Sequence, residues 1–415
     1  MKRTVSTENK QSVKTMGFHR GNITVLAGSN AIGGFGRGIM NPYLALYFVG
    51  IGGDPIKLGL LTSITSVIRC VILLLGGVTA DHYGRKRIIV LAAFYGVPIT
   101  FLYAFVQDWR IFAAISIISV FEAASSPAVH AIVADSIPSQ RRTTGIASLQ
   151  VVSSLPAIFA PLIGGLLIKT YGLFDGFRLA CICTAITGLA SVFILLFFLK
   201  ETGIDKAGQK SKLLSNNVLK NFAELLKQLP NSLKALLISY ALIVFANALV
   251  GQYYIFYATR VIGLTTLEWG IILSLQTLLT NIVKIPGGWI SDRFGKRKVM
   301  IISVLACAPC TIIFISSRSF LQVAIAALLL IVTGIYYAPA HEALQADLTP
   351  KAIRGRTTAI WDILIAVSGA LGVSFGGFLF QAVNAAVPFY LFTVIELFAA
   401  FLIISSVREP SEKEI

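Results

Sequence analysis

The chain has 415 residues, of which 56% are hydrophobic and 13% are charged, and its formal net charge is +16 at pH 7. An ordinary soluble domain carries about 25% charged residues, so this composition excludes a typical water-soluble protein. A large positive charge would indicate nucleic-acid binding in a soluble protein, but here the position of the cations along the chain decides its meaning.

Apolar stretches of about 20 residues, the length that a helix needs to cross the hydrocarbon core, recur along the whole chain. They are continuous rather than alternating, which predicts membrane helices and not a membrane β-barrel. The first stretch contains polar residues and exceeds the apolar core of a signal peptide, so we expect a retained helix. We predict an all-α membrane protein with twelve transmembrane helices at residues 23–49, 56–80, 88–107, 110–134, 143–168, 176–199, 235–259, 269–291, 299–317, 320–346, 357–381 and 386–407.

Most of the 35 Lys and Arg residues lie in the termini and in the connections that follow even-numbered helices. Positive charge accumulates on the cytoplasmic side, so we predict a multi-pass protein of the cell membrane with both termini in the cytoplasm and no nucleic-acid partner. The polar stretch 200–234 reads as a cytosolic linker between two pseudo-symmetric six-helix bundles. The predicted domains are therefore 1–199, 200–234 and 235–415.

Two segments of the first half recur in the second half. GGVTADHYGRKR at 76–87 matches GGWISDRFGKRK at 287–298, and each copy lies between the second and third helices of its half. Pro127, Asp135 and Pro138 match Pro339, Asp347 and Pro350 at nearly the same offset. Two matches at nearly one offset indicate gene duplication, which is common among transporters.

The repeated pattern G-x-x-x-D-x-x-G-[RK]-[RK] resembles the loop between helices 2 and 3 of the major facilitator superfamily. With twelve predicted helices, the resemblance covers nearly the whole chain. In that family the loop acts as a conformational latch, in which glycines allow close helix contact and a sharp reversal while acids pair with cations. Simple topogenic charge is the alternative. The resemblance implies gating residues at Gly77, Asp81, Gly84, Arg85, Gly288, Asp292, Gly295 and Lys296, with Asp135, Asp347 and Asp362 as ionic or helix-end partners.

The predicted fifth helix carries Pro156 and the run APLIGG at 160–165. This run is similar to the antiporter signature G-P-x-x-G-G of the family, with Ala in place of the first Gly. Because Pro and Gly bend membrane helices, we expect a bend at Pro156, Pro161, Gly164 and Gly165, and the similarity favours export over import. The fourth helix lacks the Arg that many proton-coupled exporters of the family have there, so the resemblance does not identify the proton carrier.

Charged residues in the middle of predicted helices are functional candidates, because a charge near the bilayer centre costs several kcal/mol unless it faces protein or water. Arg37, Arg69, Glu122 and Glu396 lie at that depth. Glu122 is the predicted proton carrier, since a buried carboxyl can exchange a proton during transport. Arg37 is its expected charge partner or a substrate anchor, and a structural ion pair is the alternative. Glu396 is an isolated acid to which we assign no role.

Polar residues recur at three- and four-residue spacing on the first and fourth helices of each half and on the eighth helix, which places them on one face of each helix. In the superfamily the first and fourth helices of each half line the substrate cavity. Aromatic and amide groups with few charges suit an amphiphilic or weakly polar solute. The expected cavity residues are Asn30, Arg37, Asn41, Glu122, Ser126, Asn247, Tyr254, Gln276 and Tyr337.

These observations predict a secondary transporter that works by alternating access, with proton-coupled efflux of drugs or amphiphilic compounds as the first choice. A proton symporter or a uniporter for a sugar, organic acid or peptide is the alternative, and a transporter-like sensor or membrane enzyme is less favoured. The sequence contains no phosphate-binding loop, and Cys307 and Cys310 lack the second ligand pair of a zinc site. We expect no enzyme activity, cofactor or metal, and a monomer whose partners are a small-molecule substrate, protons and the lipid bilayer.

Overall fold

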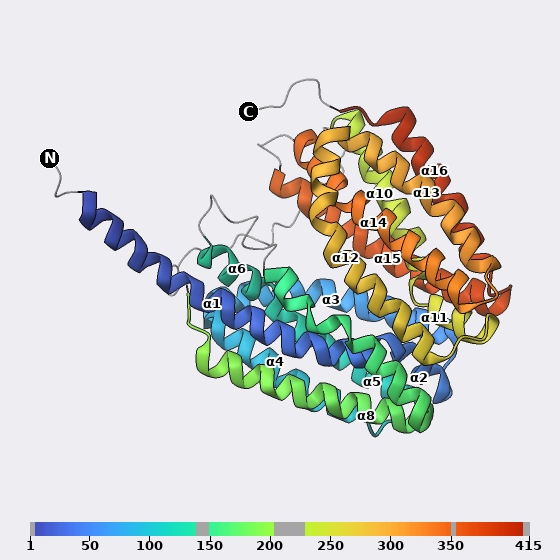
Figure 1. Cartoon of the computed structure of the whole chain (residues 1–415), viewed down its shortest axis with the longest axis horizontal. Helices are drawn as coiled ribbons and strands as arrows, with labels where there is room; N and C mark the ends of the chain where they lie inside the picture. The colour runs from blue at the N-terminus through green and yellow to red at the C-terminus, as the bar shows by residue number, and fades with distance from the viewer. Residues whose placement is uncertain (1–4, 138–148, 203–228, 350–353, 410–415) are drawn as a thin grey trace, which may run out of the picture. The chain divides into compact units, whose positions relative to one another are not determined.

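The computed structural model describes residues 5–137, 149–202, 229–349 and 354–409, and these are helical with short turns and no strand (Figure 1). The side chains of 5–20, 81, 284–289, 291–292, 354–356 and 358–359 lie outside this description. In chain order the first elements are α1 (Val5–Met40), η1 (Asn41–Tyr43), α2 (Leu44–Gly50), α3 (Pro55–Tyr83), α4 (Arg85–Tyr103), α5 (Trp109–Ser119), η2 (Val120–Ser125), α6 (Ser126–Ser136), η4 (Pro156–Ile158) and α8 (Ala160–Phe198). Then follow α10 (Asn231–Gly251), α11 (Tyr254–Phe256), η6 (Tyr257–Val261), α12 (Thr266–Phe294), α13 (Lys296–Ser316), α14 (Phe320–Leu348), α15 (Arg354–Ala382) and α16 (Val387–Ser406).

Ten helical stretches among the described residues are long and apolar enough to cross a membrane. The first predicted span, 23–49, covers the end of α1, then η1 and most of α2, and none of these elements is among the ten. The sixth predicted span and part of the fifth lie in one stretch, α8, whose helical geometry is interrupted at Gly172, with φ 82° and ψ 169°. The chain is therefore an all-helical, multi-pass membrane protein, while the number twelve stays a prediction.

The chain divides into two compact units, and the first consists of residues 1–42 and 68–211. Helix α1 packs along α8, and α4 packs against α8, η2 and α6 (Figure 1). Small residues allow the close contact of α1 with α8, because a Cβ placed on Gly36 would lie 1.9 Å from Thr187 Oγ1. Thr184 Oγ1 also donates a hydrogen bond of 2.7 Å to the Gly36 carbonyl. The hydrophobic core of the first unit includes Leu26, Ile89, Ala128, Ile132 and Leu195.

The second unit consists of residues 43–67 and 212–415. Helix α10 packs against α15 and α16, α13 packs against α14 and α16, and α12 packs against α14. The start of α3 belongs to this unit, since Ser63 Oγ hydrogen-bonds Ser374 Oγ of α15 at 2.6 Å. The predicted domains 1–199, 200–234 and 235–415 stay a prediction, since most of the predicted linker lies outside the described residues. The hydrophobic core of the second unit includes Leu233, Met300, Leu344, Trp361 and Ile403.

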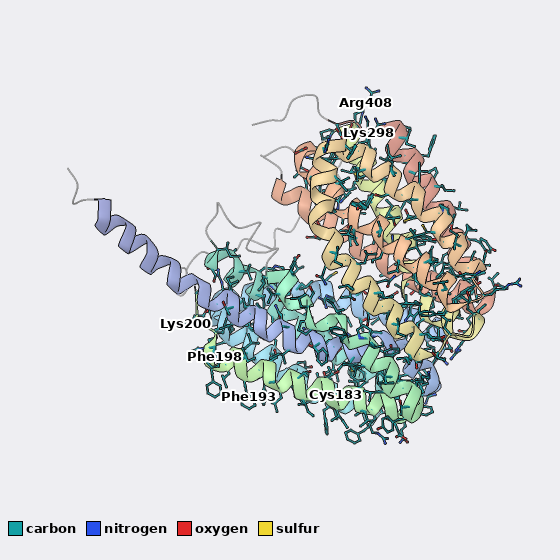
Figure 2. The ribbon with its side chains drawn as sticks, in the orientation of Figure 1. Cys183, Phe193, Phe198, Lys200, Lys298 and Arg408 are labelled. Atoms are coloured by element: carbon teal, nitrogen blue, oxygen red, sulfur yellow. The ribbon has the colours of Figure 1, made fainter. Side chains whose placement is uncertain are left out.

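Large apolar side chains also cover much of the outer surface. Phe193 and Phe198 project outward from α8, and they are 50% and 64% exposed (Figure 2). Lys200 follows at the end of this helix, where its backbone N–H donates a hydrogen bond of 2.9 Å to Asn22 Oδ1 of α1. An aromatic flank that ends at a charged residue is the pattern of a helix embedded in lipid and emerging at its surface.

Candidate functional site

Glu122 lies on η2, a 3₁₀ segment that interrupts the predicted fourth span between α5 and α6. A 3₁₀ stretch inside a longer helix often marks a functional hinge. The carboxyl of Glu122 packs against Gly96 of α4, where an added Cβ would lie 3.1 Å from Glu122 Oε2. Glycine therefore leaves the space that the carboxyl occupies.

Two cations of the first unit act on Glu122. Arg37 and Arg69 both interact with its carboxyl electrostatically, and Arg37 is the stronger of the two. Neither arginine forms a direct ion pair with Glu122 among the described side chains. The attraction therefore acts over a longer distance, which leaves the carboxyl able to meet a proton or another group.

The other polar residues expected in the first-unit cavity differ in their exposure. Asn30 is half-buried on α1, whereas Asn41 is exposed at the start of η1, where the α-helix ends. Ser126 is half-buried at the start of α6, one turn after Glu122. No described pocket joins these residues to Glu122 or Arg37, so their role in a cavity stays a prediction.

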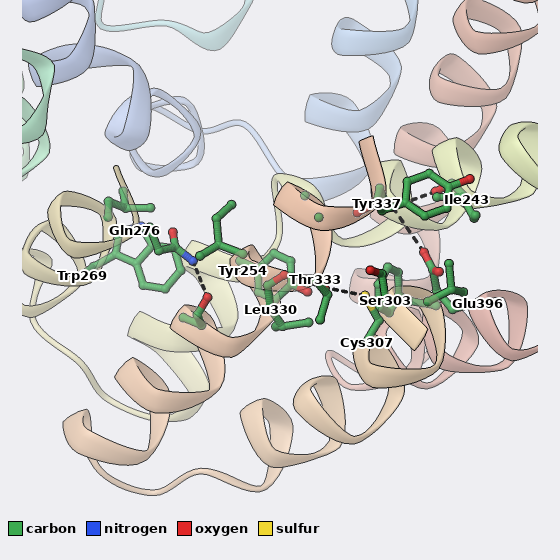
Figure 3. A pocket seen from close by; sticks show the side chains of 18 residues that line it. Ile243, Tyr254, Trp269, Gln276, Ser303, Cys307, Leu330, Thr333, Tyr337 and Glu396 are labelled. Atoms are coloured by element: carbon green, nitrogen blue, oxygen red, sulfur yellow. Dashed lines mark hydrogen bonds between the residues drawn. The ribbon is translucent and has the colours of Figure 1, made fainter. Parts of the chain in front are cut away.

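The second unit contains a pocket of about 310 Å³ between α10, α12, α13, α14 and α16 (Figure 3). Asn247, Tyr254, Gln276 and Tyr337, the four expected residues of this half, all line it. Gln276 Nε2 donates to the Ala327 carbonyl at 2.8 Å, which fixes the amide. The structure thus brings together residues that are separated by up to 90 positions in the sequence.

Aromatic packing orients two of the pocket's tyrosines. The Tyr254 ring makes edge contacts with Phe314 and Phe389, with centroids 4.9 Å and 5.1 Å away. The Tyr337 ring stacks on His341 at 5.6 Å. Because these rings are held on several sides, the pocket presents a largely preformed surface, as small-molecule sites usually do.

Glu396 of α16 was assigned no role from the sequence, but it lines this pocket. Its side chain is buried, with the residue 1% exposed, and Oε1 accepts a hydrogen bond of 3.3 Å from Asn247 Nδ2. Its position as a single acid inside a 20-residue apolar helix was the available sequence signal. The isolated position of Glu396 does not reveal that its hydrogen-bond partner comes from α10.

The two repeated loops have nearly the same backbone geometry. Gly84 and Gly295 have φ values of 95° and 91°, a region that favours glycine. In the first copy Arg85 forms an ion pair with Asp135 at the end of α6. In the second copy Lys296 forms an ion pair with Asp347 at the end of α14. The structure therefore joins each loop to the end of the fourth predicted span of the same half.

Other expected loop residues are placed differently or are not described. The side chains of Asp81 and Asp292, and the surroundings of Gly288, lie outside the described part of the chain. Asp362 is exposed on α15 and takes part in none of the described ion pairs. Gly77 was expected to allow close helix contact, but an added Cβ there would lie an ordinary 3.8 Å from Pro127 Cβ. The close contact is one residue earlier, at Gly76, where a Cβ would lie 2.3 Å from the Ala124 carbonyl oxygen.

Two glutamates that were not predicted from the sequence bind backbone N–H groups of the repeated loops. Glu201, just after α8, accepts hydrogen bonds from the backbone N–H groups of Arg85 and Lys86 at 3.0 Å and 2.9 Å. Glu409, just after α16, accepts one from the N–H of Arg297. A carboxylate at a helix N-terminus satisfies free N–H groups and interacts favourably with the helix dipole. Each glutamate follows a basic residue at the end of the last predicted span of its half, and this shared position was the signal available in the sequence.

The part of the predicted fifth span that contains Pro156 and Pro161 changes from a 3₁₀ segment to an α-helix. Pro156 begins the short segment η4, and Pro161 lies in the first turn of α8. A proline in a first turn needs no hydrogen-bond partner for its missing N–H and fits the helical geometry. Gly164 and Gly165 follow as buried residues within α8. The 3₁₀ segment before α8 lies where the bend is expected, and the bend itself stays a prediction.

Comparisons with known proteins agree with these features. The family model described as Major Facilitator Superfamily matches residues 26–280 and 236–415. An uncharacterized MFS-type transporter of Methanocaldococcus jannaschii is 24% identical over 344 residues, which cover 82% of this chain and 86% of the relative. The multidrug resistance protein MdtG of Dickeya zeae is 23% identical over 400 residues, which cover 91% of this chain and 92% of that protein.

A solved structure shares the fold. The bacterial homolog of the human lysosomal transporter Spinster, in its inward-facing and occupied conformation, matches with a TM-score of 0.72 and 14% identity, over 92% of this chain and 95% of that chain. The family and its solved neighbours indicate a transporter rather than an enzyme, and MdtG supports the resemblance to drug:proton antiporters. This chain belongs to the Major Facilitator Superfamily.

Proposed function

We propose that this chain is a twelve-span secondary transporter of the cell membrane that exports small amphiphilic organic compounds in exchange for protons. Its two halves would alternate between conformations open to either side, with both termini in the cytoplasm. Membership of the superfamily and similarity to a multidrug resistance protein support this function. The uneven distribution of Lys and Arg supports the orientation.

The observation that carries the proton-coupled mechanism is the position of Glu122. Its carboxyl lies at mid-span on a 3₁₀ interruption, against Gly96 and within the electrostatic influence of Arg37 and Arg69. A carboxyl that has no direct ion-pair partner can take up a proton, and a nearby arginine can take the place of that proton as its positive partner. In this proposal Glu122 carries the proton, and Arg37 competes with the proton for the carboxylate.

The repeated loops would then act as the gate. Each loop is joined by an ion pair to one helix end and by a glutamate to another, so that several helices meet at one point. A change of conformation that separates these helices has to break the contacts together. We propose that Arg85, Lys296 and their carboxylate partners hold one conformation until substrate or protons shift the equilibrium.

The experiment uses inside-out membrane vesicles with an acidic interior and a fluorescent amphiphilic compound outside. Efflux in exchange for protons predicts accumulation that requires the gradient and is abolished by Glu122→Gln. The matched control is Glu342→Gln, which changes an exposed acid of α14. Accumulation driven by the opposite gradient would instead indicate a symporter, and gradient-independent equilibration a uniporter. Full activity of Glu122→Gln would remove Glu122 from the mechanism.

A further inference from the structure

We infer that the second-unit pocket binds a solute that carries one positive charge, and that Glu396 is the counter-charge. This inference rests on the proposed transport function for its biological meaning and names the substrate class. Among the eighteen described residues that line the pocket, Glu396 has the only formally charged side chain. The neighbouring polar groups, Asn247, Gln276 and Ser303, are neutral. The pocket can therefore offer a negative charge and no positive one.

The surroundings of Glu396 leave most of its hydrogen-bonding capacity unused. A carboxylate has about four acceptor sites, and Asn247 supplies the one described donor, at 3.3 Å. None of the ion pairs among the described side chains includes Glu396. A buried carboxylate without a cation is strongly unfavourable, so a proton or an external cation must balance its charge. A solute that brings an ammonium group meets this need directly.

Tyr337 provides an independent sign that a polar group of a ligand belongs here. The residue is 8% exposed, and its hydroxyl has no hydrogen-bond partner among the described atoms. Stacking of its ring with His341 and Tyr240, at 5.6 Å and 6.4 Å, restricts movement of the hydroxyl toward another hydrogen-bond partner. Buried hydroxyl groups are nearly always hydrogen-bonded, so an ammonium N–H is a suitable missing partner.

The arrangement of the pocket indicates the shape of the solute. Tyr337 and Glu396 lie at one end, and Trp269 and Gln276 lie at the other (Figure 3). A solute whose ammonium group lies beside Glu396 would place an aromatic ring in contact with the indole ring of Trp269. The volume of about 310 Å³ is at the lower end of the range for small-molecule sites. A primary amine with one aromatic ring satisfies the charge, the polarity and the size together.

The test measures binding of 2-(4-nitrophenyl)ethylamine to the full-length protein in lipid nanodiscs, by quenching of tryptophan fluorescence by the nitrophenyl group. The neutral 2-(4-nitrophenyl)ethanol is the matched ligand control. The wild type should bind the amine more tightly than the alcohol, and Trp269→Phe should remove most of the quenching whereas Trp109→Phe retains it. Equal affinity of the wild-type protein for the amine and the alcohol would by itself overturn the inference.

Substitution of the acid then tests its role. Glu396→Gln should weaken amine binding roughly ten- to a hundredfold, the effect of losing a hydrogen-bonded charge, and leave alcohol binding unchanged. Glu396→Asp should keep the preference for the amine, and Glu342→Gln should bind both ligands as the wild type does. Unchanged amine binding by Glu396→Gln would refute the inference. The binding assay needs no transport, so amine binding without vesicle accumulation would refute only the proposed function.

Discussion

Removal of Glu201 should loosen the start of α4 without disturbing the equivalent helix of the other half. Its carboxylate accepts the backbone N–H groups of Arg85 and Lys86, which have no partner within the helix at its first turn. Loss of an N-terminal cap costs about 0.5–2 kcal/mol, and loss of a negative charge at this end costs about 0.3–1 kcal/mol. Because Glu201 is half-buried, we expect about 1–1.5 kcal/mol for Glu201→Ala.

Hydrogen–deuterium exchange measures this change where it occurs. A local destabilisation of about 1–1.5 kcal/mol should speed exchange of the amides at 85–90 roughly five- to thirteenfold. Glu409→Ala is the matched control, because its carboxylate accepts the N–H of Arg297 and should affect 296–301 instead. Equal effects of either variant on both loops, or no effect on its own loop, would refute the assignment of these glutamates as separate caps.

Two glycine substitutions test other close contacts. Gly376→Ala should destabilise the protein by about 1–3 kcal/mol, because the new Cβ would lie 2.2 Å from the Leu249 carbonyl oxygen. Gly369→Ala on the same helix, whose Cβ meets only Val244 at 3.8 Å, should leave the thermal unfolding midpoint nearly unchanged or raise it. Gly96→Ala should lower proton-driven transport several-fold by displacing the Glu122 carboxyl. Wild-type rates with that variant would contradict the packing described here.

Sequence periodicity predicted most of the helices because a bilayer requires long apolar stretches whatever their packing. Ten such stretches appear in the described residues. Duplication of the loop identified Gly84, Arg85, Gly295 and Lys296 because turn geometry and ion pairing require particular residue types at fixed spacing. These features depend on local sequence, which explains why they could be recognised without a structure.

Features that depend on the rotation of one helix against another were missed or misplaced. The pairing of Glu396 with Asn247 joins helices 149 positions apart, and no periodicity within either helix specifies it. The contact at Gly76 instead of Gly77 is a difference of one residue, which turns a helix face by about 100°. The 3₁₀ segment around Glu122 was also hidden, because an apolar run has the same appearance in either helical form.

The carboxyls of Glu122 and Glu396 have different electrostatic surroundings, and this difference supports different proposed roles for the two acids. At Glu122 an incoming cation must compete with Arg37 and Arg69, which already attract the carboxyl. Glu396 likewise takes part in none of the described ion pairs, and its described donor is the neutral amide of Asn247, so an incoming cation would add the first compensating charge. The second-unit pocket also offers the open volume, about 310 Å³, that an organic cation needs. The proposed proton exchange at Glu122 and the proposed solute binding at Glu396 would both meet the same requirement, that each membrane-embedded acid finds a positive partner.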